Sequence, residues 1–101
     1  METLKFYLSE KQQREGKSLY EWLLEEARRL GVSGGSAFRA IAGYGRHGRL
    51  HEETFFELGG ELPVTVEFVL ESAQADRLLE ALRPQGLKLF YVRQPAEAGV
   101  V

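Results

Sequence analysis

The residues whose types and spacing could support chemistry lie at positions 43–48, which read Gly-Tyr-Gly-Arg-His-Gly. Three glycines in six residues permit positive φ angles and a close approach of the backbone to a ligand. Arg46 and His47 lie among these glycines, and both side chains can donate hydrogen bonds to an anion. This pattern predicts either an anion site or a bulged strand end that enters a loop and leaves Arg46 in solvent.

Two other chemistries have to be weighed for the same segment. The spacing of its glycines matches the dinucleotide-binding fingerprint, and Glu67 lies about 20 residues further on, where that fingerprint has an acid. The fingerprint also needs a helix at its third glycine, and no clear helical periodicity follows. His47 and His51 are four residues apart, so a helix would place both imidazoles on one face as metal ligands. We instead expect exposed loop histidines and no metal.

Composition limits the classes of protein to which the chain can belong. Its 101 residues, 44% hydrophobic and 28% charged, fit a single globular domain without a membrane helix or a signal peptide. The net charge of −2 disfavours nucleic acid as a partner, and the absence of cysteine excludes disulfides and thiolate metal sites. Without a membrane helix or a signal peptide, we expect a cytoplasmic protein. No catalytic Ser/His/Asp set is visible, so we expect that it is not an enzyme and holds no cofactor.

The surrounding sequence predicts the elements that must position the glycine-rich segment. Alternation of apolar residues with period 2 predicts strands over 3–10, 37–44, 63–70 and 87–93. Helical spacing predicts one helix from a capping box of Ser18 and Glu21 to Gly31, and a second from a cap at Ser72 to Pro84. The order is β-α-β-β-α-β, so the fold class is α+β, a ferredoxin-like sandwich.

We expect one domain over 1–93, with a loop at 11–17, a long loop at 45–62 and a loose tail at 94–101.

Both faces of the predicted sheet carry apolar side chains. The two helices can cover only one face of the sheet, so a monomer should be polar on the other. A closed homo-oligomer that buries the second face is therefore expected. The out-of-phase apolar residues are Tyr7, Ile41 and Val69, and near the C-terminus Phe90 and Val92 alternate with Leu87, Leu89 and Tyr91.

Nearly the whole chain resembles the PII signalling proteins. The turn at 31–36, a strand and the motif at 43–47 resemble the Gly-aromatic-Gly-Arg sequence that opens the long T-loop of those proteins. Leu62-Pro63 resembles the exit of that loop. The Gly-x-Gly-Arg-x-Gly motif, the preceding Gly-Gly pair and the acidic strand 63–68 are most similar to the PII-like family long catalogued as a domain of unknown function.

The resemblance implies a PII-like trimer, with sheets packed around the axis and an adenine nucleotide in each cleft between neighbouring subunits. His47 stands where PII proteins have an amide. The turn 84–88 is shorter than its PII counterpart, which favours a mono- or diphosphate over a triphosphate. By resemblance, nucleotide binding is assigned to seven residues: Gly43, Gly45, Arg46, His47, Gly86, Lys88 and Arg93.

The resemblance also implies that the long loop signals to a partner such as a membrane transporter or channel, with Arg49, Phe55 and Phe56 as contacts. A metal-responsive trimer resembling the CutA family is the alternative, with His47 and His51 as ligands. An enzyme of the acylphosphatase type shares the strand order, but the segment 9–16 lacks the glycine-rich cradle that it needs. An RNA-binding module is disfavoured because the strands lack the basic and aromatic RNP pattern.

Overall fold

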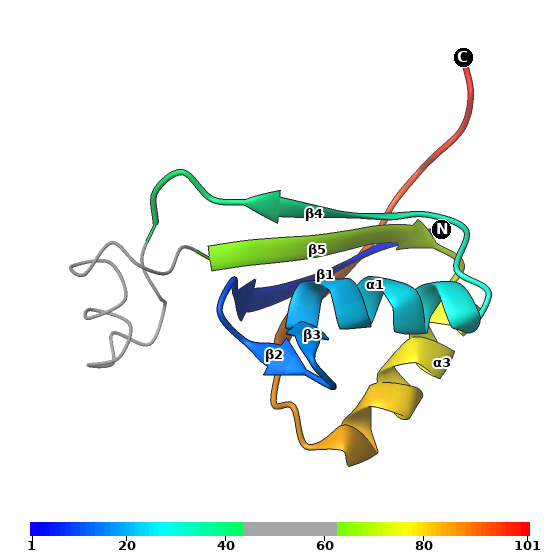
Figure 1. The fold of residues 1–101 in the computed structure, drawn as a ribbon. Helices are drawn as coiled ribbons and strands as arrows, with labels where there is room; N and C mark the ends of the chain where they lie inside the picture. The colour runs from blue at the N-terminus through cyan, green and yellow to red at the C-terminus, as the bar shows by residue number, and fades with distance from the viewer. Residues whose placement is uncertain (44–62) are drawn as a thin grey trace.

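Two helices lie on one face of a four-stranded antiparallel sheet in the computed structural model, which describes residues 1–43 and 63–101 (Figure 1). The sheet has the strand order β4-β5-β1-β6. This arrangement confirms the predicted α+β class and the ferredoxin-like topology. The described elements are β1 (Glu2–Ser9), β2 (Gln13–Arg14), β3 (Lys17–Ser18), α1 (Leu19–Arg29), β4 (Gly35–Arg39), β5 (Pro63–Leu70), α3 (Ser72–Leu82), a 3₁₀ turn (Arg83–Gln85) and β6 (Phe90–Pro95).

The core forms between the helices and alternate residues of the two central strands. Buried and less buried side chains alternate along β1 and β5, as expected for strands covered on one face. The rings of Phe6 and Phe68 meet edge to face at 6.3 Å between centroids. The buried core residues on these elements are Leu4, Phe6, Leu8, Leu19, Trp22, Leu23, Ala27, Val64, Val66, Phe68, Leu70, Ala75, Leu78, Leu79 and Leu82.

The helix ends differ in detail from the prediction. Ser18 precedes α1, but its side chain makes no capping hydrogen bond, so the predicted capping box with Glu21 is wrong. Ser72 is the first residue of α3 rather than its cap; Glu71 holds that position and its N–H donates to Gln74 Oε1 at 3.0 Å. Gly31, with φ of +94°, follows α1 as predicted, since a left-handed glycine there ends a helix without strain.

Strand boundaries also move, each for a local reason. The expected loop at 11–17 contains the β2–β3 hairpin, whose turn has positive φ at Glu15 and Gly16. β4 ends at Arg39 instead of continuing to residue 44, because its partner β5 begins only at Pro63. β6 starts at Phe90 because Lys88 has a φ of +56°, and it continues to Pro95, two residues into the segment 94–101 that was assigned to the tail.

The face of the sheet away from the helices carries a row of aromatic residues. Cross-strand pairing aligns Phe38, Thr65, Tyr7 and Phe90 from one edge of the sheet to the other. Phe38 is 54% exposed, Tyr7 39% and Phe90 42%, and the rings of Tyr7 and Phe90 contact at 5.7 Å between centroids. The predicted apolar second face is therefore present, and within the described chain it remains open to solvent.

Candidate functional site

Three strand ends meet where the chain leaves the sheet after β4 and returns at β5. Ser9, at the end of β1, pairs with Pro63, and the N–H of Ala40 donates to the Pro63 carbonyl at 2.9 Å. Gly43 is exposed beside this junction, where a Cβ would lie 4.0 Å from Pro63 Cγ, an ordinary contact. The sequence therefore folds so that the start of the glycine-rich motif lies at the end of a rigid sheet.

Most of the predicted ligand and partner residues lie outside the described part of the chain. Gly43 is the first residue of the motif and the last one before the segment 44–62. The residues that fall in that segment are Gly45, Arg46, His47, Arg49, His51, Phe55 and Phe56. Their assignments therefore stay predictions.

Arg39 and Glu10 form an ion pair at the same junction, which the sequence pattern did not single out. Arg39 Nε donates to Glu10 Oε1 at 2.6 Å, between residues 29 positions apart in the chain. Because β5 lies between β4 and β1, this ion pair spans the first residues of β5. Only a spatial view reveals it, since neither residue belongs to a recognisable motif.

The turn after α3 contains two left-handed residues. Gly86 has φ of +72°, which a glycine accepts freely, and Lys88 has φ of +56°, which is uncommon for a residue with a side chain. Such residues collect at binding sites, where the surrounding structure enforces the conformation. Gly86 and Lys88, the two predicted ligand residues of this turn, are both exposed in the structure.

The β2–β3 hairpin supports this turn from the side of α1. Arg14 donates through Nη2 to Gln85 Oε1, and its guanidinium carbon lies 5.0 Å from the centroid of the Trp22 ring. Arg14 Nε is buried and has no hydrogen-bond partner among the described residues. Sequence reasoning missed this contact because it assigned 11–17 to an irregular loop.

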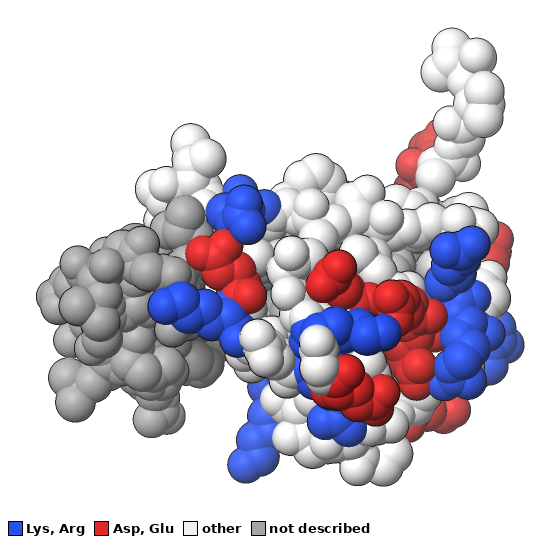
Figure 2. All heavy atoms as spheres, in the orientation of Figure 1, with Lys and Arg blue, Asp and Glu red and all other residues white. Residues whose placement is uncertain are grey.

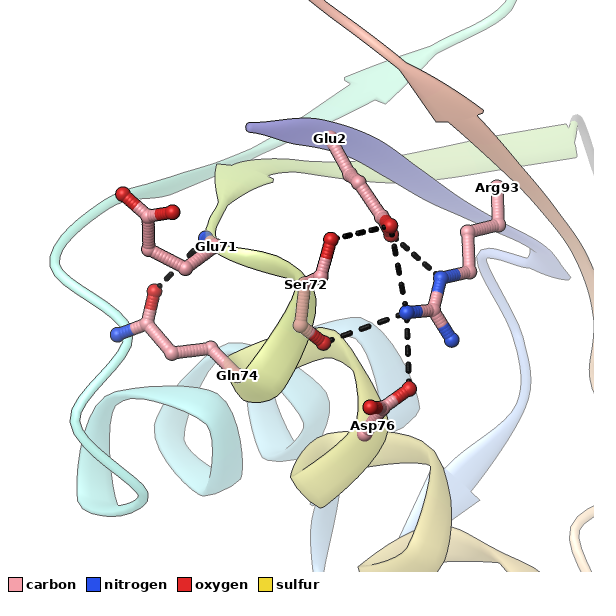
Figure 3. Close-up of polar contacts among 6 residues, drawn as sticks. All are labelled: Glu2, Glu71, Ser72, Gln74, Asp76 and Arg93. Carbon is pink, nitrogen blue, oxygen red and sulfur yellow. Dashed lines mark hydrogen bonds and ion pairs between the residues drawn. The ribbon is translucent and has the colours of Figure 1, made fainter.

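Arg93, by contrast, lies in a polar network at the opposite end of the sheet (Figure 3). Its guanidinium donates to Glu2, to the Ser72 carbonyl at 3.2 Å and to Asp76 Oδ1 at 2.8 Å, and the Ser72 hydroxyl donates to Glu2 Oε2 at 2.6 Å. The hydrogen bond from Arg93 lowers the pKa of Glu2, and the same bond raises the pKa of Arg93. The network ties β1, α3 and β6 together.

The predicted ligand residues that the structure describes, Gly43, Gly86, Lys88 and Arg93, therefore do not lie together within one chain. Arg93 pairs with Leu4 of β1, whereas Pro63 at the junction pairs with Ser9 of the same strand. Leu4 and Ser9 are five residues apart, so Arg93 and the junction are separated by about 17 Å along β1. β4 and β6 are opposite edges of the sheet, about 14 Å apart at ordinary strand spacing. Gly43 and Lys88 consequently lie near the same end of the sheet but beyond different edges.

The face of the molecule seen in Figure 2 has no large region of one charge sign among the described residues. Figure 2 shows basic and acidic side chains intermixed over the helices and the hairpin, and mostly neutral atoms along β4. A nucleic-acid groove requires a basic stripe, which this view does not contain.

Among residues 1–43 and 63–101, no group of three or more His, Asp or Glu could hold a metal ion. No helix in those ranges has the length and apolar character needed to cross a bilayer.

Comparison with known proteins identifies the family. The chain is 40% identical over 80 residues to a UPF0166 protein of Aquifex aeolicus. The aligned region covers 79% of this chain and 76% of that protein. A structure of CPII bound to ADP, AMP and acetate, from Thiomonas intermedia K12, is similar with a TM-score of 0.68, 16% identity and coverage of 98% and 88% of the two chains.

A second solved structure has the same architecture. It is described as a PII-like signaling protein from Thermus thermophilus, with a TM-score of 0.55, 17% identity and coverage of 91% and 80% of the two chains. The DUF190 family model, described as uncharacterized ACR, matches residues 1–97. The chain is thus a member of the DUF190 family and has the PII-like form of the ferredoxin-like fold.

Proposed function

We propose that the protein is a PII-like regulator that binds an adenine nucleotide in clefts between copies of the chain. The observation that carries the proposal is the separation of the candidate residues. Gly43 and Lys88 lie at one end of the sheet but beyond opposite edges, so one chain cannot surround a ligand with them. A neighbouring copy can supply the second half of such a site.

The open face of the sheet supports assembly into a trimer. Aromatic side chains lie on this face at β4, β1 and β6, with Thr65 of β5 between the first two. Exposed apolar patches of this kind mark interaction surfaces. A cyclic assembly needs a contact surface at both sides of each copy, and Phe38 and Phe90 provide apolar surface at the two edge strands. A trimer with its sheets facing the axis covers this row.

An adenine nucleotide is the ligand that the available support favours. The structurally similar CPII protein is bound to ADP and AMP. In this chain, Gly43 and the residues that follow it are proposed to contact the phosphates from one copy, with Gly86 and Lys88 from the next. The short turn at 84–88 offers few backbone donors, which favours AMP or ADP over ATP. Arg93 is already paired with Glu2 and Asp76, so we give it a structural role.

Signalling is proposed to pass through the segment 45–62 to a partner such as a membrane transporter or channel. Arg49, Phe55 and Phe56 are the proposed contacts. A ligand that shifts a two-state population from 1:99 to 99:1 must favour one state by about 5.5 kcal/mol, which is more than one arginine–phosphate contact supplies. Several donors from two copies must therefore act together, and no catalytic step is required.

Isothermal titration calorimetry with AMP, ADP, ATP and cyclic AMP tests the ligand, and sedimentation equilibrium tests the assembly. We expect AMP or ADP to bind more tightly than ATP, and a mass of about three times 11.4 kDa for the wild type. Lys88→Gln should weaken binding about tenfold through loss of a charged hydrogen bond, whereas Lys17→Gln on the hairpin should not. Absence of binding at millimolar nucleotide would refute the proposal.

A further inference from the structure

The ion pair between Arg39 and Glu10 links two strand ends across a third. Arg39 is the last residue of β4 and pairs with Val64 of β5, while Glu10 follows the last residue of β1. The bond from Arg39 Nε to Glu10 Oε1 therefore crosses β5 beside Pro63, where the chain returns to the sheet. Arg39 also precedes Gly43, the first residue of the proposed phosphate motif, by only four positions.

The two partners of this ion pair differ in how firmly they are held. Glu10 lies in a turn closed by three hydrogen bonds: Gln12 N–H to the Ser9 carbonyl at 3.1 Å, Ser9 N–H to Gln12 Oε1 at 2.7 Å and Lys11 N–H to Ser9 Oγ at 3.2 Å. The Glu10 side chain is 23% exposed and that of Arg39 is 59% exposed. The backbone that carries Glu10 is thus held by the turn, and the more exposed guanidinium of Arg39 is accessible to a solute.

Only one edge of the Arg39 guanidinium is used in the described structure. Nε donates to Glu10, and within residues 1–43 and 63–101 no hydrogen bond from Nη1 or Nη2 is present. A phosphate carries more charge than a carboxylate and accepts two parallel N–H bonds from an arginine fork. An exposed carboxylate–arginine pair is a weak competitor for such a ligand, because water screens both charges.

We propose that Arg39 is a phosphate-binding residue that exchanges its partner, from Glu10 to a phosphate group of the nucleotide, when the ligand binds. The inference rests on the proposed function and adds a residue to it. Glu10 holds the arginine in the free protein and competes with the ligand for it. Ligand binding then removes the link between the ends of β4 and β1.

Calorimetric titration of ADP into Arg39→Gln and Glu10→Gln tests the exchange, because the two substitutions break the same ion pair with opposite expected effects. Arg39→Gln should weaken binding at least about tenfold, since a charged hydrogen bond is lost. Glu10→Gln should tighten binding about two- to fivefold, since a competing ion pair is removed. A purely structural ion pair would shift both affinities in the same direction. Lys17→Gln and Glu25→Gln break an exposed pair on the hairpin and α1, and serve as controls expected to leave affinity unchanged.

An unchanged affinity for Arg39→Gln, or weaker binding for Glu10→Gln, would overturn the exchange while leaving nucleotide binding intact. If the wild type binds no ADP, the proposed function fails, and the exchange is then judged with pyrophosphate alone. The Nε–H signal of Arg39 in nitrogen-15 NMR, identified by its absence in Arg39→Gln, should move on addition of pyrophosphate as Glu10 is released. A signal that stays in place at saturating pyrophosphate overturns the exchange. Far-UV circular dichroism of each variant establishes that the fold is retained.

Discussion

Gly35 allows β4 to begin against the ring of Phe68. A Cβ at this position would lie 2.5 Å from Phe68 Cε1 and 3.0 Å from Leu24 Cδ2, closer than a side chain can approach without movement of its neighbours. Gly35→Ala should therefore destabilise the fold by about 1–3 kcal/mol, as overpacked cores do. Urea unfolding measures the change. Gly34→Ala is the matched control, because its Cβ would have no neighbour within 4 Å. Equal losses in the two variants would contradict the packing argument.

Glu2 gives the stability of the fold a dependence on acid pH. The hydrogen bond from Arg93 holds the pKa of Glu2 below its ordinary value of 4.5. A lowered pKa in the folded state means that the contribution is fully present above the unfolded-state pKa and is lost as pH falls through the folded pKa. Glu2→Gln should therefore lower the melting temperature at pH 7, and the difference from wild type should shrink below about pH 4.

Thermal denaturation between pH 7 and pH 2.5 gives this comparison directly. Glu80→Gln removes an exposed carboxylate on α3 outside the polar network and is the control. A melting temperature of Glu2→Gln that stays below that of wild type by the same amount at all pH values would show that the ion pair is not the cause.

At the scale of elements, the periodicity of apolar residues predicts a helix or strand well where its conformation depends on its own sequence. The alternation in β1 and β5 and the apolar stripe of α1 place the core, and all three were predicted close to their observed bounds. The β2–β3 hairpin and the start of β6 depend on positive φ at Glu15 and Lys88, which residue type does not predict. The end of β4 depends on where its partner strand begins.

For the candidate site, the sequence predicts individual positions but not the contacts between residues that lie far apart in the chain. Gly43, Gly86 and Lys88 were assigned by resemblance, and the structure describes all three. The pairs Arg39–Glu10 and Arg14–Gln85 join residues 29 and 71 positions apart, so no local pattern contains them. Arg93 is assigned to the ligand by its resemblance to basic residues past the last strand, and the fold also pairs it with Glu2, 91 positions away in the chain.

Arg14 should hold the β2–β3 hairpin against α1 and the turn after α3. Its stack on Trp22 and its bond to Gln85 are expected to stabilise the hairpin by about 1–2 kcal/mol together. Arg14→Ala should therefore speed amide exchange at Leu19, whose N–H donates to the Gln12 carbonyl across the base of the hairpin. Gln85→Ala keeps the stack and should have a smaller effect. Exchange at Leu19 that is unchanged in Arg14→Ala would contradict this role.

At the scale of the whole molecule, the open face of the sheet matters most. Among the residues that the structure describes on this face, one ion pair lies between apolar side chains. Lys5 and Glu67 lie directly opposite each other on β1 and β5, with Nζ and Oε2 3.6 Å apart and side chains 32% and 35% exposed. In an isolated chain such a pair contributes little, because water screens it. When other copies cover the face, the pair loses that water, and each charge then depends on the other for compensation.

Reversal of one of these charges should therefore separate a covered face from an exposed one. In a covered face, Lys5→Glu places two negative charges together without solvent and should weaken association by at least about 3 kcal/mol, or a hundredfold, because an uncompensated buried charge costs that much. The double substitution Lys5→Glu with Glu67→Lys restores opposite charges and should recover most of the association. Sedimentation equilibrium over a range of concentrations measures both, with Lys17→Glu on the hairpin as a control. A face that stays in water would instead give the same mass for all four proteins, and the proposed packing of the sheets around an axis would then be wrong.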